Sequence, residues 1–290
     1  MGGLLGRRRR AARPGGRRLH RPGEGPPDPA PRPVLRRTGH RADRAVAAAH
    51  PGALPAGASP RGRRFAAAHA EGIFVTATRP EILAHSIAAT RAAAEELGRD
   101  PRSIKFFTLM TVITAPTDEE ARAKYRDYAQ YVSLEGALTL YGGWSGLDLS
   151  TMDPDKPLRY AETEAVRSAV EAFTTVDPDR DWTPRDIAEW IGIGGMGVVV
   201  VGSPATVADE MQRWVDVADV DGFNLAYAVT PGTFEDLVEL VVPELRRLGL
   251  LPPSYAGDTL REELYGPGQT RLRADHPGAR YAARSRVGVR

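Results

Sequence analysis

The sequence predicts an α/β fold in which repeated strand–helix units build a parallel sheet. Three observations support this prediction. Short apolar runs suited to buried strands alternate with amphipathic segments suited to helices, the connections between them are short, and the helices open with capping residues. From Phe65 onward four such units follow one another, about half of an eight-unit TIM barrel. The pattern alone leaves open whether the sheet is wound open or closed into a barrel.

The first two units lie before residue 131. Residues 71–77 are a short apolar run typical of a buried strand, and residues 80–97 follow as a helix that Gly98 ends. The expected apolar face of this helix comprises Ile82, Leu83, Ile87, Ala94 and Leu97. Residues 104–115 are almost wholly apolar, as expected of a strand covered on both faces. Thr117 and Glu120 then predict a capping box for the next helix.

The other two units follow residue 182. Thr183 caps a helix over 183–191, and residues 196–203 and 221–227 are the third and fourth strands. Between these strands, Ser203 and Pro204 open a helix whose expected apolar stripe is Val207, Met211, Trp214, Val215 and Ala218. A last helix is expected to be capped by Thr233 and kinked or restarted at Pro243, before Gly249. Its expected inward residues are Phe234, Leu237, Val238 and Val241.

Between the two pairs of units the pattern lapses, from Tyr131 to Thr183. Much of this stretch is rich in Gly, Asp and Pro, and it is far longer than an ordinary connection. It is interpreted as an insertion over 138–180, either a surface ornament or a wall of a binding site. Trp144 and Leu147 in so polar a segment favour a substrate-covering role.

The N-terminal segment differs from the rest of the chain. Residues 1–64 contain 16 Arg, no Lys and 3 acidic residues, whereas residues 65–290 carry a net charge of −11. Closely spaced prolines predict that residues 1–53 form a disordered tail. There are two alternative interpretations of residues 1–53. One is a basic arm that binds polyanions, and the other is a GC-rich coding sequence translated out of frame. The arm has no aromatic residue before Phe65, so binding to nucleic acid is not favoured. The ordered domain is expected over 54–250, with a C-terminal extension over 251–290.

Several classes of function receive no support from the composition. The chain has no cysteine and no apolar run long enough to span a membrane, and its start lacks the apolar core of a secretory signal, so we expect a cytoplasmic protein. Its six histidines show no metal-ligand spacing, so no metal site is expected. No nucleophile motif or catalytic constellation is evident, and the catalytic residues stay unassigned.

A candidate anion site precedes the first helix. Ser59 and Pro60 form a helix start, while Gly57 and Gly62 allow the backbone to approach a ligand closely. Free N–H groups at such a start, with a flanking Arg, are suited to a phosphate. Phe65, Ala66 and Ala68 are expected to face a core. The alternative is an ordinary cap, because Ser203 and Pro204 make the same pattern.

A second glycine-rich stretch, "GIGGMG" at 192–197, matches the letters of a dinucleotide-binding motif. That motif must follow a strand and open a helix. Here it follows a helix and leads into a strand, so we interpret it as a loop.

Four stretches together resemble one family: "AGASPRGRRFAAAHAEGIFV", "YGGWSGLDLS", "WTPRDIAEWIGIGGMGVVVVGSPATVADEMQRW" and "DGFNLAYAVTPGTFEDLVELVVPELRRLG". The family is that of the bacterial-luciferase-like flavin-dependent monooxygenases, in the branch of nitrilotriacetate monooxygenase component A and dibenzothiophene-sulfone monooxygenase. The resemblance covers about residues 56–285. It implies a TIM barrel that uses reduced FMN from a separate flavin reductase, with O2 and a small organic substrate, in a homo-oligomer. It also implies that Gly57, Ala58 and Ser59, with Gly62, contact the FMN phosphate.

The resemblance is confined to the C-terminal half of the family, whose members are much longer. "AHPGALP" stands where an apolar strand normally precedes the phosphate turn, and the family's catalytic residues fall in the other half. We therefore expect a partial barrel, inactive alone and prone to associate through unpaired strand edges. The alternatives are a deazaflavin-dependent enzyme of a related branch and a non-catalytic assembly or polyanion-binding protein that uses the basic arm.

Overall fold

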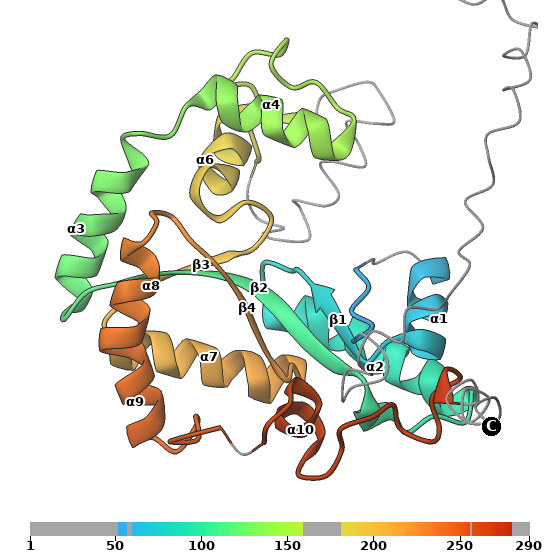
Figure 1. Ribbon diagram of the computed structural model, residues 1–290. Coiled ribbons are helices and arrows are strands. Elements are labelled where there is room, and N and C mark those ends of the chain that lie inside the picture. Colours follow the sequence, from blue (N-terminus) through green and yellow to red (C-terminus); the bar gives the residue numbers. More distant parts are fainter. Residues whose placement is uncertain (1–51, 57–59, 159–180, 256, 280–290) are drawn as a thin grey trace, which may run out of the picture. The chain divides into compact units, whose positions relative to one another are not determined.

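The computed structural model describes residues 52–56, 60–158, 181–255 and 257–279 (Figure 1). Four strands and the helices that follow them alternate along most of this part of the chain. In order, the elements are α1 (Pro60–His69), β1 (Gly72–Val75), α2 (Pro80–Glu96), η1 (Pro101–Ser103), β2 (Lys105–Thr114), α3 (Asp118–Ala129), α4 (Leu134–Ser145), α6 (Pro184–Gly194), β3 (Val198–Gly202), α7 (Pro204–Ala218), β4 (Gly222–Ala226), α8 (Gly232–Asp236), the π-helical turn η3 (Leu237–Val241), α9 (Val242–Arg247) and α10 (Leu260–Tyr265). None of the described helices combines the length and the apolar character needed to cross a bilayer.

All four strands are parallel, and β2 is the central one. It pairs with β1 through 105–108, with β4 through 107–111 and with β3 through 110–114. Two strands that pair with the same residues of β2 must lie on opposite sides of it. The range paired with β4 overlaps the ranges paired with β1 and with β3, so β4 lies on one side of β2. The strands β1 and β3 lie on the other side, one after the other along β2. The expected parallel α/β sheet is confirmed. The strand order differs from a simple barrel sequence, because β4 lies beside β2 and not beside β3.

The free edge of β1 is covered by a short extended segment. The carbonyl of Ala53 accepts hydrogen bonds from Glu71 and Gly72, and the carbonyl of Pro55 accepts one from Phe74. Ala56 forms a parallel bridge with Phe74. Residues 53–56 therefore take the place of the strand whose apolar run the sequence lacks, and they lead directly toward the helix α1.

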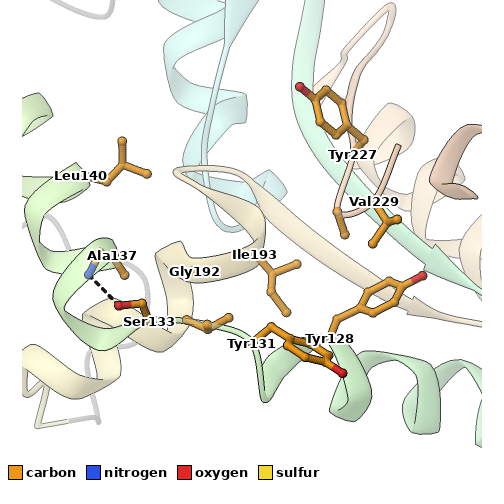
Figure 2. Close-up of a pocket in the computed structure, with 12 residues that line it drawn as sticks. Tyr128, Tyr131, Ser133, Ala137, Leu140, Gly192, Ile193, Tyr227 and Val229 are labelled. Atoms are coloured by element: carbon orange, nitrogen blue, oxygen red, sulfur yellow. Dashed lines mark hydrogen bonds between the residues drawn. The ribbon is translucent and has the colours of Figure 1, made fainter. Parts of the chain in front are cut away.

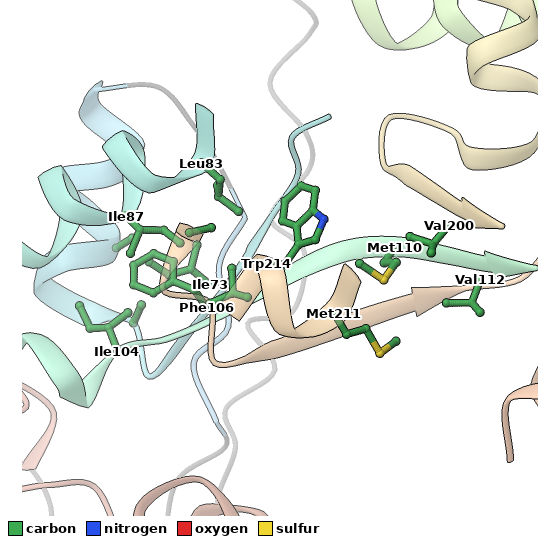
Figure 3. Packing of buried hydrophobic residues seen from close by; sticks show 14 of the residues in the cluster. Ile73, Leu83, Ile87, Ile104, Phe106, Met110, Val112, Val200, Met211 and Trp214 are labelled. Carbon is green, nitrogen blue, oxygen red and sulfur yellow. The ribbon is translucent and has the colours of Figure 1, made fainter. Parts of the chain in front are cut away.

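The main core lies between the sheet and the helices α2 and α7. Phe106, Met110 and Val112 alternate along β2 and are all buried on its helix-covered face, as Figure 3 shows. Trp214 of α7 is fully buried in the same cluster, and its indole N–H donates to Glu210 over 2.9 Å. This core fixes the position of the sheet on which the candidate sites are built.

The insertion has a smaller core of its own. The prediction of irregular structure there is wrong for residues 138–145, which belong to helix α4. Ser133 caps α4, and Gly146 ends it in the left-handed conformation at φ 73°. Helices α4 and α6 pack together around a buried cluster made of Ala137, Leu138, Tyr141, Leu149, Leu158, Trp182, Ile187, Ala188 and Ile191. Residues 159–180, most of the remaining insertion, lie outside the described residues.

A polar network closes the amino ends of the strands. Glu71, just before β1, forms a bidentate ion pair with Arg261 of α10, with N–O distances of 2.6 and 2.9 Å. The Tyr265 hydroxyl donates to the carbonyls of Glu71 and Ser103. The buried Arg91 of α2 donates to the carboxylate of Asp221, just before β4. The C-terminal extension thus anchors the end of the sheet that serves stability in barrels of this class.

Several side-chain placements differ from the sequence prediction. Phe65, Leu97, Val215, Phe234 and Val238 are exposed. Thr233 is not the N-cap residue, because α8 already begins at Gly232. The buried Thr233 hydroxyl instead accepts hydrogen bonds from the amides of Ala228 and Val229. The predicted break at Pro243 is confirmed, since η3 precedes it and α9 begins at Val242. A π turn suits a following proline, which supplies no N–H.

The capping box of α3 gives a first prediction. The Thr117 hydroxyl accepts from the Glu120 amide over 3.2 Å, and the Glu120 carboxylate accepts from the Thr117 amide over 3.1 Å. Thr117→Ala should lower the free energy of unfolding by about 1 kcal/mol, measured by urea denaturation. Thr139→Ala on the exposed face of α4 is the matched control and should change it far less. Equal effects of the two substitutions would contradict a role for the cap.

Candidate functional site

The sequence-predicted phosphate turn is only partly described. Gly57, Ala58 and Ser59 lie outside the described residues, whereas Gly62 lies in the first turn of α1. Ala56, just before the turn, and Arg63, in the second turn of α1, line a cavity of about 470 Å³. Among the described residues of α1, Arg63 and Ala66 face this cavity. The contacts of the turn itself stay a prediction.

This first cavity, which we call the α1 cavity, has the composition of a site for an anion with an apolar body. Arg63 is its one charged residue among the described lining residues. The other walls are mainly apolar, with Ile73, Leu83 and Phe106 among them. Its volume lies within the usual range of small-molecule sites. The residues present thus fit a phosphorylated cofactor with a large ring.

A second cavity of about 540 Å³, which we call the aromatic cavity, lies between the insertion and the end of β4 (Figure 2). Tyr128 lies in the last turn of α3, Tyr131 lies two residues beyond that helix, and Tyr227 follows β4. The remaining lining residues are Val132, Ser133, Gly136, Ala137, Leu140, Gly192, Ile193, Ala228 and Val229. None of these twelve described residues is Asp, Glu, Lys, Arg or His.

Close packing of the insertion against the end of α3 shapes the aromatic cavity. A Cβ atom at Gly192 would lie 2.3 Å from Cγ1 of Val132, so only glycine lets α6 approach this closely. Ala137, on the neighbouring helix α4, is buried in the insertion core. The wall formed by α4 and α6 is therefore held by a packed core.

The two predicted substrate-covering residues lie elsewhere. Trp144 is 52% exposed, and its Cη2 atom is 3.6 Å from the position that a Cβ on Gly195 would take. Leu147 packs against the insertion core. Neither residue lines the aromatic cavity or the α1 cavity. Their covering role stays a prediction.

The stretch "GIGGMG" lies between a helix and a strand, as predicted, but the prediction of a loop is wrong for its first three residues. Residues 192–194 are the last of α6, and Gly195 ends the helix at φ 60°. A Cβ at Gly197 would lie 2.7 Å from Leu109 of the central strand, so this glycine permits close packing. The Thr76 hydroxyl donates to the Met196 carbonyl over 2.6 Å, which joins the end of β1 to the approach of β3.

The titratable groups near the carboxyl ends of the strands serve the scaffold. The Asp118 carboxylate accepts hydrogen bonds from the Ser203 amide and the Thr206 hydroxyl, and these bonds lower the pKa of Asp118. Lys124 pairs with Asp236 and also donates to the Thr114 carbonyl. In the part of the chain that the structure describes, no group of three or more His, Cys, Asp or Glu side chains is arranged to hold a metal.

Sequence reasoning missed the three tyrosines of the aromatic cavity. One signal was present, since Tyr227 directly follows an apolar strand and residues at the carboxyl ends of barrel strands commonly line active sites. Tyr128 and Tyr131 gave no such signal. They end an amphipathic helix, where a tyrosine is an ordinary surface residue.

Comparison with known proteins gives a consistent result. A family model described as luciferase-like monooxygenase matches residues 17–220, a range that begins inside the Arg-rich segment. The dimethyl-sulfide monooxygenase of Hyphomicrobium sulfonivorans is 47% identical over 226 residues, which are 78% of this chain and 47% of that protein. Nitrilotriacetate monooxygenase component A of Aminobacter aminovorans and the dibenzothiophene-sulfone monooxygenase of Rhodococcus erythropolis also match, at 30% and 29% identity.

Solved structures agree with the sequence matches. The crystal structure of DmoA from Hyphomicrobium sulfonivorans superposes with a TM-score of 0.71, covering 79% of this chain and 48% of that one, at 47% identity. A riboflavin lyase with modified FMN and riboflavin superposes with a TM-score of 0.67 at 37% identity, covering 81% of this chain and 51% of that one. The chain thus spans about half the length of the curated relatives it matches.

Proposed function

This chain belongs to the luciferase-like monooxygenase family, and on that premise we propose that it contributes the phosphate-binding half of a monooxygenase using reduced FMN, O2 and a small organic substrate. The observation that supports this most directly is the α1 cavity, which Arg63 lines together with mainly apolar residues. An ordinary helix cap would not require a cavity of about 470 Å³ next to it.

The chain's own residues would bind and orient the cofactor. The amides of Gly57, Ala58 and Ser59 and of the first turn of α1 would donate hydrogen bonds to the phosphate, and Arg63 would neutralise part of its charge. Apolar side chains from β1, α2 and β2 would exclude water from the ring system. When bound, the reduced flavin supplies the electrons that activate O2, and the protein supplies position and a dry environment.

The partners are proposed on the same basis. A separate flavin reductase would deliver the reduced FMN, and the complete enzyme would be a cytoplasmic homo-oligomer. Since the described strands form only part of a barrel, we propose that the 290-residue chain alone is inactive and binds FMN more weakly than a complete barrel. The remaining strands of the barrel would supply the wall facing the flavin ring.

FMN titration of the 290-residue chain tests the proposal. Ser59→Ala and Arg63→Ala should each raise the Kd for FMN about tenfold, because the first removes a hydroxyl donor to the phosphate and the second removes a positive charge. Arg64→Ala is a matched control on the same helix: Arg64 is exposed and does not line the cavity, so its loss should leave the Kd nearly unchanged. The proposal fails if flavin fluorescence shows the same Kd for all three variants and the unmodified chain.

A further inference from the structure

We propose that the aromatic cavity binds an uncharged, apolar organic molecule, so that the oxygenation proposed above acts on neutral lipophilic substrates in preference to carboxylates. The inference names the substrate class of the proposed function and depends on it for the reaction. The selectivity itself is a binding property, and it is argued from the residues of the cavity alone.

The first argument concerns charge. Among the described residues, no Arg, Lys or His lines the aromatic cavity, and three tyrosines with Val132, Leu140, Ile193 and Val229 supply most of its walls. A carboxylate placed there would lose its water and gain no cationic partner, which is strongly unfavourable. A neutral molecule loses far less hydration on entry. We therefore expect the charge of a ligand to affect its binding to this cavity more strongly than its shape does.

The second argument concerns the exposed apolar surface of the cavity. Tyr131 is 79% exposed and Tyr227 is 59% exposed, and Leu140 and Val229 are each more than 40% exposed. These four side chains line one cavity although they come from three separate parts of the fold (Figure 2). Burying this apolar surface under a ligand favours binding through the hydrophobic effect.

The polar groups in the cavity suit a weakly polar ligand. The Ser133 hydroxyl already accepts from the Gly136 amide over 3.0 Å as the cap of α4, and it keeps its own hydrogen for donation. Each tyrosine offers one phenolic hydroxyl. These hydroxyls can donate to or accept from an alcohol, ether or thioether, whereas no cation among the described lining residues is present to pair with a carboxylate.

The third argument is position. The strand β4 and the turn after it line both cavities, because Asn224 lies on the α1 cavity and Tyr227 on the aromatic cavity. Three residues of extended chain span about 10 Å. The two cavities therefore meet the same segment of chain, at positions about 10 Å apart. Tyr227 also contacts Phe234, with ring centroids 5.8 Å apart, which supports its orientation.

Paired ligands test the proposal on the full 290-residue chain. Calorimetric titration should show at least tenfold tighter binding of 1-octanol than of octanoate, which has the same chain length and a negative charge at neutral pH. Leu140→Lys should reverse this preference, weakening octanol and tightening octanoate about tenfold each. Leu248→Lys is the control: Leu248 is exposed to a similar degree, 42% against 46%, but lies outside the cavity, so the preference for octanol should persist.

The outcomes separate this inference from the flavin proposal. The inference is overturned if octanoate binds as tightly as octanol, if neither ligand binds a chain with native circular dichroism, or if Leu140→Lys and Leu248→Lys act alike. Arg63→Ala should weaken FMN and leave octanol binding unchanged, because Arg63 lines only the α1 cavity. A chain that selects octanol but does not bind FMN would support the cavity and refute the flavin proposal.

Discussion

Glu71→Gln should lower the free energy of unfolding by about 3–5 kcal/mol, because it removes the carboxylate charge that faces the buried guanidinium of Arg261. Both side chains are less than 10% exposed and meet in a bidentate pair. One Glu71 oxygen also accepts from the Ala53 amide over 3.2 Å, so the substitution also weakens the attachment of residues 53–56. Urea denaturation followed by circular dichroism measures the loss.

The same pair predicts a dependence on pH. Burial raises the pKa of Glu71, but hydrogen bonds from Arg261 and Ala53 and the charge of Arg261 outweigh it, so the pKa lies below its ordinary value. A carboxyl group with a lowered pKa stabilises the fold above its unfolded pKa of about 4.3 and loses this contribution as the pH falls through the folded pKa. The difference in unfolding free energy between the unmodified chain and Glu71→Gln should therefore be constant from pH 7 to pH 5.5 and shrink toward pH 3.

A surface ion pair supplies the control. Glu81 pairs with Arg213 over 2.5 Å, but both side chains are more than 40% exposed, so Glu81→Gln should cost no more than about 1 kcal/mol. The double substitution Glu71→Met with Arg261→Met should cost less than either single one, because no charge is then left buried. Equal losses for Glu71→Gln and Glu81→Gln would show that the C-terminal extension does not anchor the sheet.

The elements of this fold could be predicted where local chemistry decides them. The strand β2 is mostly apolar, and its start at Lys105 and end at Thr114 fall within one residue of the prediction. The capping box of α3 and the Thr183 cap of α6 depend only on residues three apart, and both form as expected. A hydrogen bond between near neighbours needs no knowledge of the rest of the chain.

Long-range features could not be predicted in this way. The position of β4 beside β2 depends on contacts between residues more than 100 positions apart. Helix α4 was missed because Gly142 and Gly143 reduce its helix propensity, whereas burial of Tyr141 and Leu138 in the insertion core stabilises it. Leu97 and Val215 have the correct spacing for a core face but are exposed in the part of the chain that the structure describes.

The two cavities differ in how well the sequence predicts them, and the reason is again the difference between local and long-range features. The α1 cavity adjoins a turn that a short sequence pattern marks, because a serine–proline helix start is a local feature. The aromatic cavity combines four segments, at 128–133, 136–140, 192–193 and 227–229. No single segment resembles a binding motif, and only the fold brings the three tyrosines together.

Trp214→Ala should also cost about 3–5 kcal/mol, since it removes a large, fully buried side chain and leaves a cavity behind. Figure 3 shows the indole among Ile73, Phe106 and Met110, the residues that join α7 to the sheet. The substitution also removes the hydrogen bond that the indole N–H donates to Glu210. The expected loss of unfolding free energy exceeds the transfer free energy of the indole ring. The surrounding strands are held by their pairing with one another, so they fill the cavity left by the ring only partly.

Val215→Ala is the matched control for this prediction, on the same helix and one residue away. Val215 is 40% exposed, so its truncation should change the free energy of unfolding by no more than about 0.5 kcal/mol. Thermal unfolding should show a much larger fall in Tm for Trp214→Ala than for Val215→Ala. Similar Tm values would mean that α7 does not pack on the sheet through Trp214. The strand β3, which directly precedes α7, would then lack the support on which the approach of the insertion to the cavities depends.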